Sequence, residues 1–66
     1  MQIQFNDEPM QCAEGQTVSE LLAALNQLKP GVALALNQQI LPREQWRQHI
    51  VQEGDQILLF HVIAGG

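Results

Sequence analysis

The stretch "QILLFHVI", residues 56–63, is apolar on both of the faces that a strand would present, and "AGG", residues 64–66, follows it. Continuous apolar runs of this length are typical of strands in the middle of a sheet, buried on both faces. As a helix, the run would be far too short to cross a bilayer. The sequence therefore predicts a folded domain over residues 1–63, whose last strand is central, and a flexible tail over residues 64–66.

The amino-terminal residues predict a hairpin. In "MQIQFN", residues 1–6, apolar and polar side chains alternate, which indicates a strand with one buried face. The polar residues 7–9 form a predicted turn, and "MQC", residues 10–12, resumes the alternation. Two neighbouring antiparallel strands are therefore expected at the start of the chain.

A helix is expected next. The stretch "TVSE" has the pattern of a capping box, in which the Thr17 hydroxyl accepts from the backbone of Glu20 and the Glu20 side chain reaches back. Apolar residues then recur at helical spacing and form one stripe of about three turns. The stripe consists of Val18, Leu21, Leu22, Leu25 and Leu28. "KPG", residues 29–31, is expected to end the helix.

The rest of the chain predicts strands separated by short irregular segments. "VALAL", residues 32–36, is a third strand, residues 40–41 form a short fourth one, and Pro42 begins an irregular or single-turn helical segment that carries Trp46. "EGD", residues 53–55, is a tight turn before the last strand. This order of elements is that of an α+β domain of the β-grasp (ubiquitin-like) type, a mixed sheet packed on one main helix, with the last strand parallel to the first.

Length, charge and cysteine content limit the possible functions. The 66 residues suffice for one domain, and seven acidic against three basic residues give a net charge of −4, which argues against nucleic-acid binding. The charge favours a partner with a basic docking surface, or serves solubility alone. One cysteine permits no internal disulfide, and "MQIQFND" has no signal-peptide pattern, so we expect a cytoplasmic protein, monomeric when free, that binds no membrane.

Few side chains suggest chemistry of their own. Cys12 with His49 or His61 could supply a nucleophile and a base, but the spacing of these residues does not support this. Cys12 falls on the same face of its predicted strand as Met10, so we expect it to be a small core residue. His49 is expected to be structural or solvated, and His61 is a modest candidate for contact with a partner. Arg43 could anchor a partner or an internal carboxylate, and the internal role is favoured. No metal-ligand pattern is present in the sequence.

The carboxylate at the end of the tail is the remaining reactive group. As a mixed anhydride with AMP, the carboxylate of Gly66 would become a strong acyl donor, but a separate enzyme would have to use ATP to form it. Gly65 and Gly66 suit such an enzyme, because a tail without Cβ atoms can enter a narrow channel close to another backbone. Ala64 belongs to the same predicted tail.

Three stretches carry a resemblance to a known family: "MQIQFND" at 1–7, "ALNQQILPREQW" at 35–46 and "GDQILLFHVIAGG" at 54–66. The chain resembles the ThiS family of sulfur carrier proteins of thiamine biosynthesis, above all its enterobacterial members, and the resemblance extends over essentially all 66 residues. The Gly-Gly end alone is shared with ubiquitin and other ubiquitin-like proteins.

This resemblance implies a carrier and not an enzyme. An E1-like activating enzyme (ThiF type) would adenylate the carboxylate of Gly66 with ATP, and a persulfide sulfur donor would convert it to a thiocarboxylate. A thiazole synthase (ThiG type) would then take the sulfur. No cofactor would be bound to the carrier itself, and the AMP on Gly66 would be transient. The alternatives are a small subunit of molybdopterin synthase and, more remotely, a ubiquitin-like modifier of other proteins.

The face of the last strand that partners would contact follows from strand alternation. If Ile57 and Leu59 point toward the helix, then Leu58, Phe60 and Val62 point away from it. The expected partner-binding residues are Leu58, Phe60, Val62 and Ile63. Since one helix can cover only one face of a sheet, Phe60 would be partly exposed, as partner surfaces often are. The alternative is that the segment around Trp46 folds over this row.

Overall fold

The last strand lies in the middle of the sheet. The computed structural model of the chain describes residues 1–61. Its strands are β1 (Gln2–Phe5), β2 (Glu8–Gln11), β3 (Val32–Leu36), β4 (Gln39–Ile40) and β5 (Gln56–His61), and its helices are α1 (Val18–Ala24) and the 3-10 turn η1 (Arg43–Gln45). The strand order is β2-β1-β5-β3-β4, and β1 and β5 are parallel while the other pairs are antiparallel. The predicted β-grasp topology is thus confirmed. Residues 62 and 63 of the predicted last strand, and the predicted tail 64–66, lie outside the described residues.

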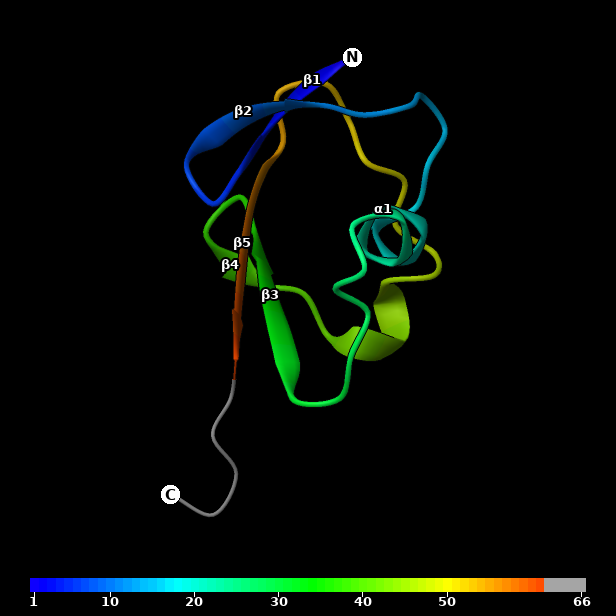
Figure 1. Ribbon diagram of the computed structural model, residues 1–66, viewed down its shortest axis with the longest axis vertical. Helices are drawn as coiled ribbons and strands as arrows, with labels where there is room; N and C mark the ends of the chain where they lie inside the picture. Colours follow the sequence, from blue (N-terminus) through cyan, green and yellow to red (C-terminus); the bar gives the residue numbers. More distant parts are fainter. Residues whose placement is uncertain (62–66) are drawn as a thin grey trace.

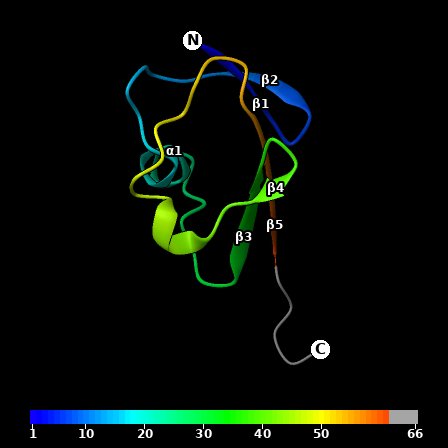
Figure 2. The ribbon, with the colours of Figure 1, turned by 180° about the vertical axis from the view of Figure 1, so that it is seen from behind.

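The fold has two layers. The sheet forms one layer, and α1 and η1 lie together on the same side of it (Figures 1 and 2). Nine buried apolar side chains fill the space between the layers: Ile3, Val18, Leu21, Leu22, Val32, Leu34, Trp46, Val51 and Ile57. No helix among residues 1–61 is long and apolar enough to cross a membrane.

The first hairpin turns one residue earlier than predicted. Asn6 and Asp7 have φ of 51° and 67°, the left-handed conformation of a two-residue hairpin turn, so β2 begins at Glu8 instead of after Pro9. Asn and Asp tolerate this conformation better than most residues do. Pro9 fits within β2 because β2 is an edge strand, where the missing amide donor leaves no partner unsatisfied.

The helix is shorter than predicted. Its capping box is present: the amide of Glu20 donates to the Thr17 hydroxyl at 3.1 Å, and the amide of Thr17 donates to the Glu20 carboxylate at 2.9 Å. The helix ends at Ala24, because Asn26 has a φ of 59° and its amide donates to the carbonyl of Ala23. Leu28, predicted to belong to the apolar stripe, lies beyond the helix and is 41% exposed.

The segment after β4 is held against the start of α1. The fourth strand covers residues 39–40 rather than 40–41. Beyond it, the indole of Trp46 donates to the carbonyl of Leu41 at 2.9 Å, and Trp46 is 2% exposed. The amides of Val18 and Ser19, which have no partner within the helix, donate to the carbonyls of His49 and Trp46. The segment therefore lies on the inner, helix-bearing side of the sheet.

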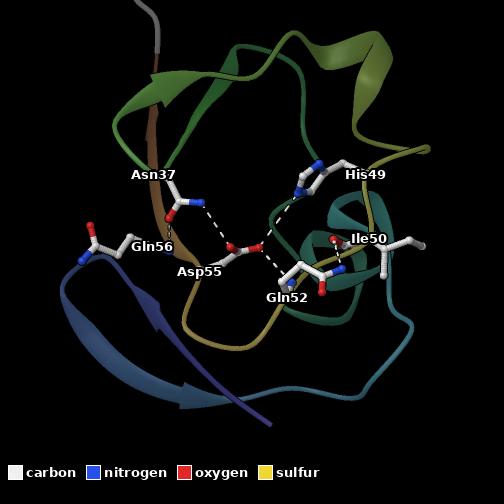
Figure 3. A network of polar contacts seen from close by, with 6 residues as sticks. All are labelled: Asn37, His49, Ile50, Gln52, Asp55 and Gln56. Carbon is white, nitrogen blue, oxygen red and sulfur yellow. Dashed lines mark hydrogen bonds and ion pairs between the residues drawn. The ribbon is translucent and has the colours of Figure 1, made fainter.

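A polar network fixes the start of β5. Figure 3 shows the carboxylate of Asp55, 8% exposed, accepting from the Asn37 side-chain amide at 3.1 Å and from the backbone amide of Gln52 at 2.8 Å. The Asn37 side-chain oxygen accepts in turn from the amide of Gln56 at 3.0 Å. His49 Nε2 lies 3.9 Å from Oδ2 of Asp55, the carboxylate oxygen that accepts from the Gln52 amide. One side chain of the β3–β4 turn thus joins that turn to the first residue of β5.

We predict that Asn37→Gly destabilises the protein by about 1–2 kcal/mol, because it leaves the Gln56 amide without a partner and removes one of the two hydrogen bonds that the Asp55 carboxylate accepts. Gln38→Gly is the matched control, since Gln38 has a φ of 71°, like Asn37 at 51°, but its side chain is exposed. Urea unfolding followed by circular dichroism measures both. Equal effects of the two substitutions would show that the side-chain bonds of Asn37 contribute nothing.

Candidate functional site

β5 presents apolar side chains on the outer face of the sheet, away from α1. Ile57 is 1% exposed and Leu59 packs against the core, whereas Leu58 and Phe60 are each 40% exposed. The predicted orientation of Leu58 and Phe60 is therefore confirmed. The alternative, that the segment around Trp46 covers this row, is wrong, because Trp46 belongs to the core on the opposite face.

The strand register widens this row into a patch. Ala33 lies opposite Phe60, Ala35 lies opposite Leu58, and Ile40 of β4 lies opposite Ala35 on its other side. Ile40 is 63% exposed. These five residues, Ala33, Ala35, Ile40, Leu58 and Phe60, form what we call the outer apolar patch. None of them is charged, and the two alanines are short, so the larger side chains of the patch extend above them.

Three members of the patch were not predicted from the sequence. Alternation within "VALAL" does place Ala33 and Ala35 on one face, but the sequence does not indicate which strand lies beside β5 or in which register. Ile40 belongs to a strand of two residues, whose short pattern assigns no face. Of the predicted partner-binding residues, Val62 and Ile63 lie outside the described residues, as do Ala64, Gly65 and Gly66.

The end of β5 is fixed by a side chain from the first hairpin. β1 pairs with β5 only as far as Phe5 opposite Ile57. Past that point, the Asn6 backbone amide donates to the carbonyl of Ile57 at 2.8 Å, and its side-chain oxygen accepts from the amide of Leu59 at 2.9 Å. Asn6 thereby continues the parallel ladder by one step and holds the part of β5 that carries the patch.

The side chains considered for catalysis are not brought together. Among residues 1–61, no hydrogen bond or ion pair joins Cys12 to either histidine, and no group of three His, Cys, Asp or Glu residues could hold a metal. Cys12 packs against the core as predicted, and its burial raises the pKa of the thiol. His49 belongs to the Asp55 network, which fits its predicted structural role, and His61 is exposed at the end of β5.

Arg43 has an internal role, but not the predicted one. Its Nη1 donates to the carbonyl of Lys29 at 2.9 Å, and its guanidinium carbon lies 5.0 Å from the centroid of the Trp46 ring. The expected carboxylate partner is absent among the described residues. A backbone carbonyl and an aromatic ring hold the guanidinium instead, as cation–π geometry allows.

Comparison with known proteins identifies the family. The model of the ThiS family matches residues 3–66. The chain belongs to the ThiS family. It is 74% identical, over all 66 residues of both chains, to "Sulfur carrier protein ThiS" of Escherichia coli strain K12. It is also 35% identical over 66 residues to a protein of Magnetococcus marinus named "Thiazole synthase", of which the match covers 20%.

Solved structures agree with the fold. The crystal structure of a thiamine biosynthesis protein, ThiS, from Geobacter metallireducens superposes with a TM-score of 0.89, at 32% identity and with complete coverage of both chains. The solution structure of a thiamine biosynthesis protein from the same organism gives a TM-score of 0.76. The predicted family and the predicted β-grasp fold are both confirmed. The name of the Escherichia coli relative agrees with the predicted role as a carrier rather than a catalyst.

The raised pKa of the Cys12 thiol predicts that this side chain reacts slowly in the folded protein. Because burial favours the neutral thiol, less thiolate is present at neutral pH than in an unfolded chain. We predict that iodoacetamide alkylates the native protein at pH 8 more slowly than the same protein in urea, as followed by intact mass. A native thiol that reacts faster than the unfolded one would instead indicate an activated nucleophile.

Proposed function

We propose that the chain carries sulfur for the synthesis of the thiazole ring of thiamine, as a thiocarboxylate on Gly66. The observation that carries this proposal is the match to the Escherichia coli sulfur carrier protein, at 74% identity over the full length of both chains. The glycines at positions 65 and 66 fit this chemistry, because a tail without Cβ atoms can enter a narrow channel close to another backbone.

The chemistry requires an activating enzyme and three steps. A carboxylate oxygen of Gly66 attacks the α-phosphorus of ATP, and pyrophosphate leaves, so that an acyl adenylate forms. The terminal sulfur of a persulfide then attacks the acyl carbon, and AMP leaves. A thiol then attacks the persulfide's inner sulfur, a disulfide forms between the two, and the thiocarboxylate leaves. ATP is a substrate of the activating enzyme, and AMP is attached to the carrier only between the first two steps.

The partners are an E1-like activating enzyme, a persulfide sulfur donor and a thiazole synthase. The last is supported by the Magnetococcus marinus protein named thiazole synthase, which contains a segment similar to this whole chain. We place the process in the cytoplasm and expect the free carrier to be a monomer. The domain over residues 1–63 serves for recognition, and the tail over residues 64–66 enters the partner's active site.

The outer apolar patch is the proposed docking surface for the activating enzyme. It lies on β5, the strand that leads toward the reacting terminus, so contacts there would fix the position from which the tail starts. Phe60 is the expected anchor, since aromatic side chains at the centre of an interface can each contribute about 2 kcal/mol or more. Leu58 and Ile40 would surround it, and Val62 and Ile63 are proposed to extend the surface.

We predict that incubation with the activating enzyme, ATP and a sulfide or persulfide source changes the intact mass by the replacement of one oxygen with one sulfur. A chain without Gly66 is the control: it should keep its circular dichroism spectrum and show no such change. The reacting carboxylate would be displaced by a whole residue, and even about 1 Å of misplacement can cost about a hundredfold in rate. Sulfur incorporation into the truncated chain would refute the assignment of Gly66.

We further predict that Phe60→Ala weakens binding to the activating enzyme more than tenfold, measured by titration calorimetry, while the unfolding free energy falls by no more than about 1 kcal/mol. Ile50→Ala is the matched control, because Ile50 is equally exposed, at 40%, but is paired with Thr17 next to α1 and belongs neither to the patch nor to strand β5. If both substitutions leave the affinity unchanged, the docking surface lies elsewhere.

A further inference from the structure

A groove lies on the helix-bearing side of the domain, away from the outer apolar patch. It has a volume of about 430 Å³ and runs between α1 and η1. Its lining residues are Ser19, Leu28, Arg43, Glu44, Trp46 and Arg47. Because α1 and η1 lie on one side of the sheet and the patch lies on the other, a molecule in this groove would not touch the patch (Figure 1).

The positive charge of the chain is concentrated at this groove. The protein has only three basic residues and seven acidic ones, yet Arg43 and Arg47 both line the groove and the backbone of Lys29 binds Arg43. Within residues 1–61, none of the three basic side chains forms an ion pair. Glu44 is the one acidic residue in the lining, and the other six lie elsewhere in the chain. An acidic protein thus has one local positive surface.

The groove also has an apolar component. Leu28 is released from the helix because Asn26 ends α1, and it is 41% exposed at the rim. Trp46 belongs to the lining but is only 2% exposed, and the Arg43 guanidinium lies 5.0 Å from the centroid of its ring and donates to the carbonyl of Lys29. The guanidinium of Arg43 is therefore pre-organised, whereas Arg47 is exposed and free to turn toward a ligand. Two cationic groups beside an apolar wall match a segment that carries both acidic and aliphatic side chains.

We propose that this groove docks an acidic segment of a partner protein, with an aliphatic side chain of the segment against Leu28 and its carboxylates on Arg43 and Arg47. A segment of protein fits better than a small anion, because the apolar Leu28 lies in the lining together with the two arginines. Charge complementarity of this kind chiefly speeds encounter and selects the partner. Groove binding stands independently of the proposed function. The further idea that two different proteins bind at once, one in the groove and one on the patch, does rest on the proposed function.

Trp46 provides the measurement, since it is the only tryptophan of the chain and lines the groove. The probe is a capped synthetic peptide of aspartate and glutamate with a central leucine, titrated into the full chain at low salt. We expect a saturable change in tryptophan emission that weakens as salt is added. A companion peptide with serine in place of the leucine should bind several-fold more weakly, because less apolar surface is buried.

Two pairs of variants test the role of charge. Arg47→Gln should weaken the peptide at least about threefold, the effect expected of one exposed charge pair. Its control, Gln11→Glu, changes the net charge equally, from −4 to −5, on a remote strand and should have no such effect. Glu44→Gln should tighten binding by a similar factor, whereas Glu8→Gln, which makes the same charge change on β2, should not.

Several outcomes would overturn the proposal. Absence of saturable binding, or equal effects of Arg47→Gln and Gln11→Glu, would show that the groove does not recognise the peptide. If inorganic phosphate or ATP caused the same saturable change in tryptophan emission, with the same dependence on Arg47, the groove would be a site for a phosphate ligand and not for a peptide. A concentration-dependent dimer abolished by Arg47→Gln would identify the occupant as a second copy. The expected result is instead that Phe60→Ala leaves peptide binding unchanged while Arg47→Gln weakens it, which separates this site from the patch.

Discussion

The arrangement of the domain depends on the insertion of β5 between β1 and β3. This strand comes last in the sequence, yet it pairs in parallel with the first strand and antiparallel with the third. Both of its edges are hydrogen-bonded at its start, and its inward side chain Ile57 is part of the core. A parallel neighbour requires a crossover connection, and the segment from β2 through α1 and η1 supplies it. α1 and η1, which belong to this connection, therefore cover the inner face of the sheet at β5.

Polar side chains at the two tight turns fix the position of β5. Asn37 in one turn binds both Asp55 and the first amide of the strand, and Asn6 in the other turn binds the amide of Leu59. Both asparagines have positive φ, a conformation that Asn adopts at lower cost than most residues. The same residue type thus forms the turn and supports the neighbouring strand. β5 is therefore held at its first residue and again at Leu59.

One helical layer can bury only one face of this sheet. The inner face receives Trp46, α1 and the rest of the core, and the outer face keeps Leu58, Phe60 and Ile40 partly exposed. Exposed apolar area of this kind is unfavourable in the free protein and favourable in a complex, because its removal from water contributes about 25 cal/mol per Å². The basic groove on the helical side is chemically different. The two surfaces of this small domain therefore suit different partners.

The sequence predicted the elements well where the pattern was local and less well where competing turn residues decided their limits. The capping box at Thr17 and the alternation in residues 1–6 each involve neighbours within four residues, so they could be recognised directly. The helix end at Ala24 could not, because Asn26 in a left-handed conformation ended it before "KPG". The continuous apolar run from residue 56 suggested burial on both faces, but Leu58 and Phe60 are each 40% exposed.

What the sequence by itself determined is the order of the elements, the buried parity of the first strand, the family resemblance and the glycines at positions 65 and 66 on which the proposed chemistry rests. Only the tertiary structure decided that Ala33, Ala35 and Ile40 join Phe60 in one patch, because strand order and register depend on contacts between residues far apart in the chain. It likewise brought Arg43 and Arg47 beside Leu28. The physical reason is the same in both cases. Local sequence patterns determine on which face of its element a side chain lies, whereas tertiary packing determines which residues from other elements lie next to it.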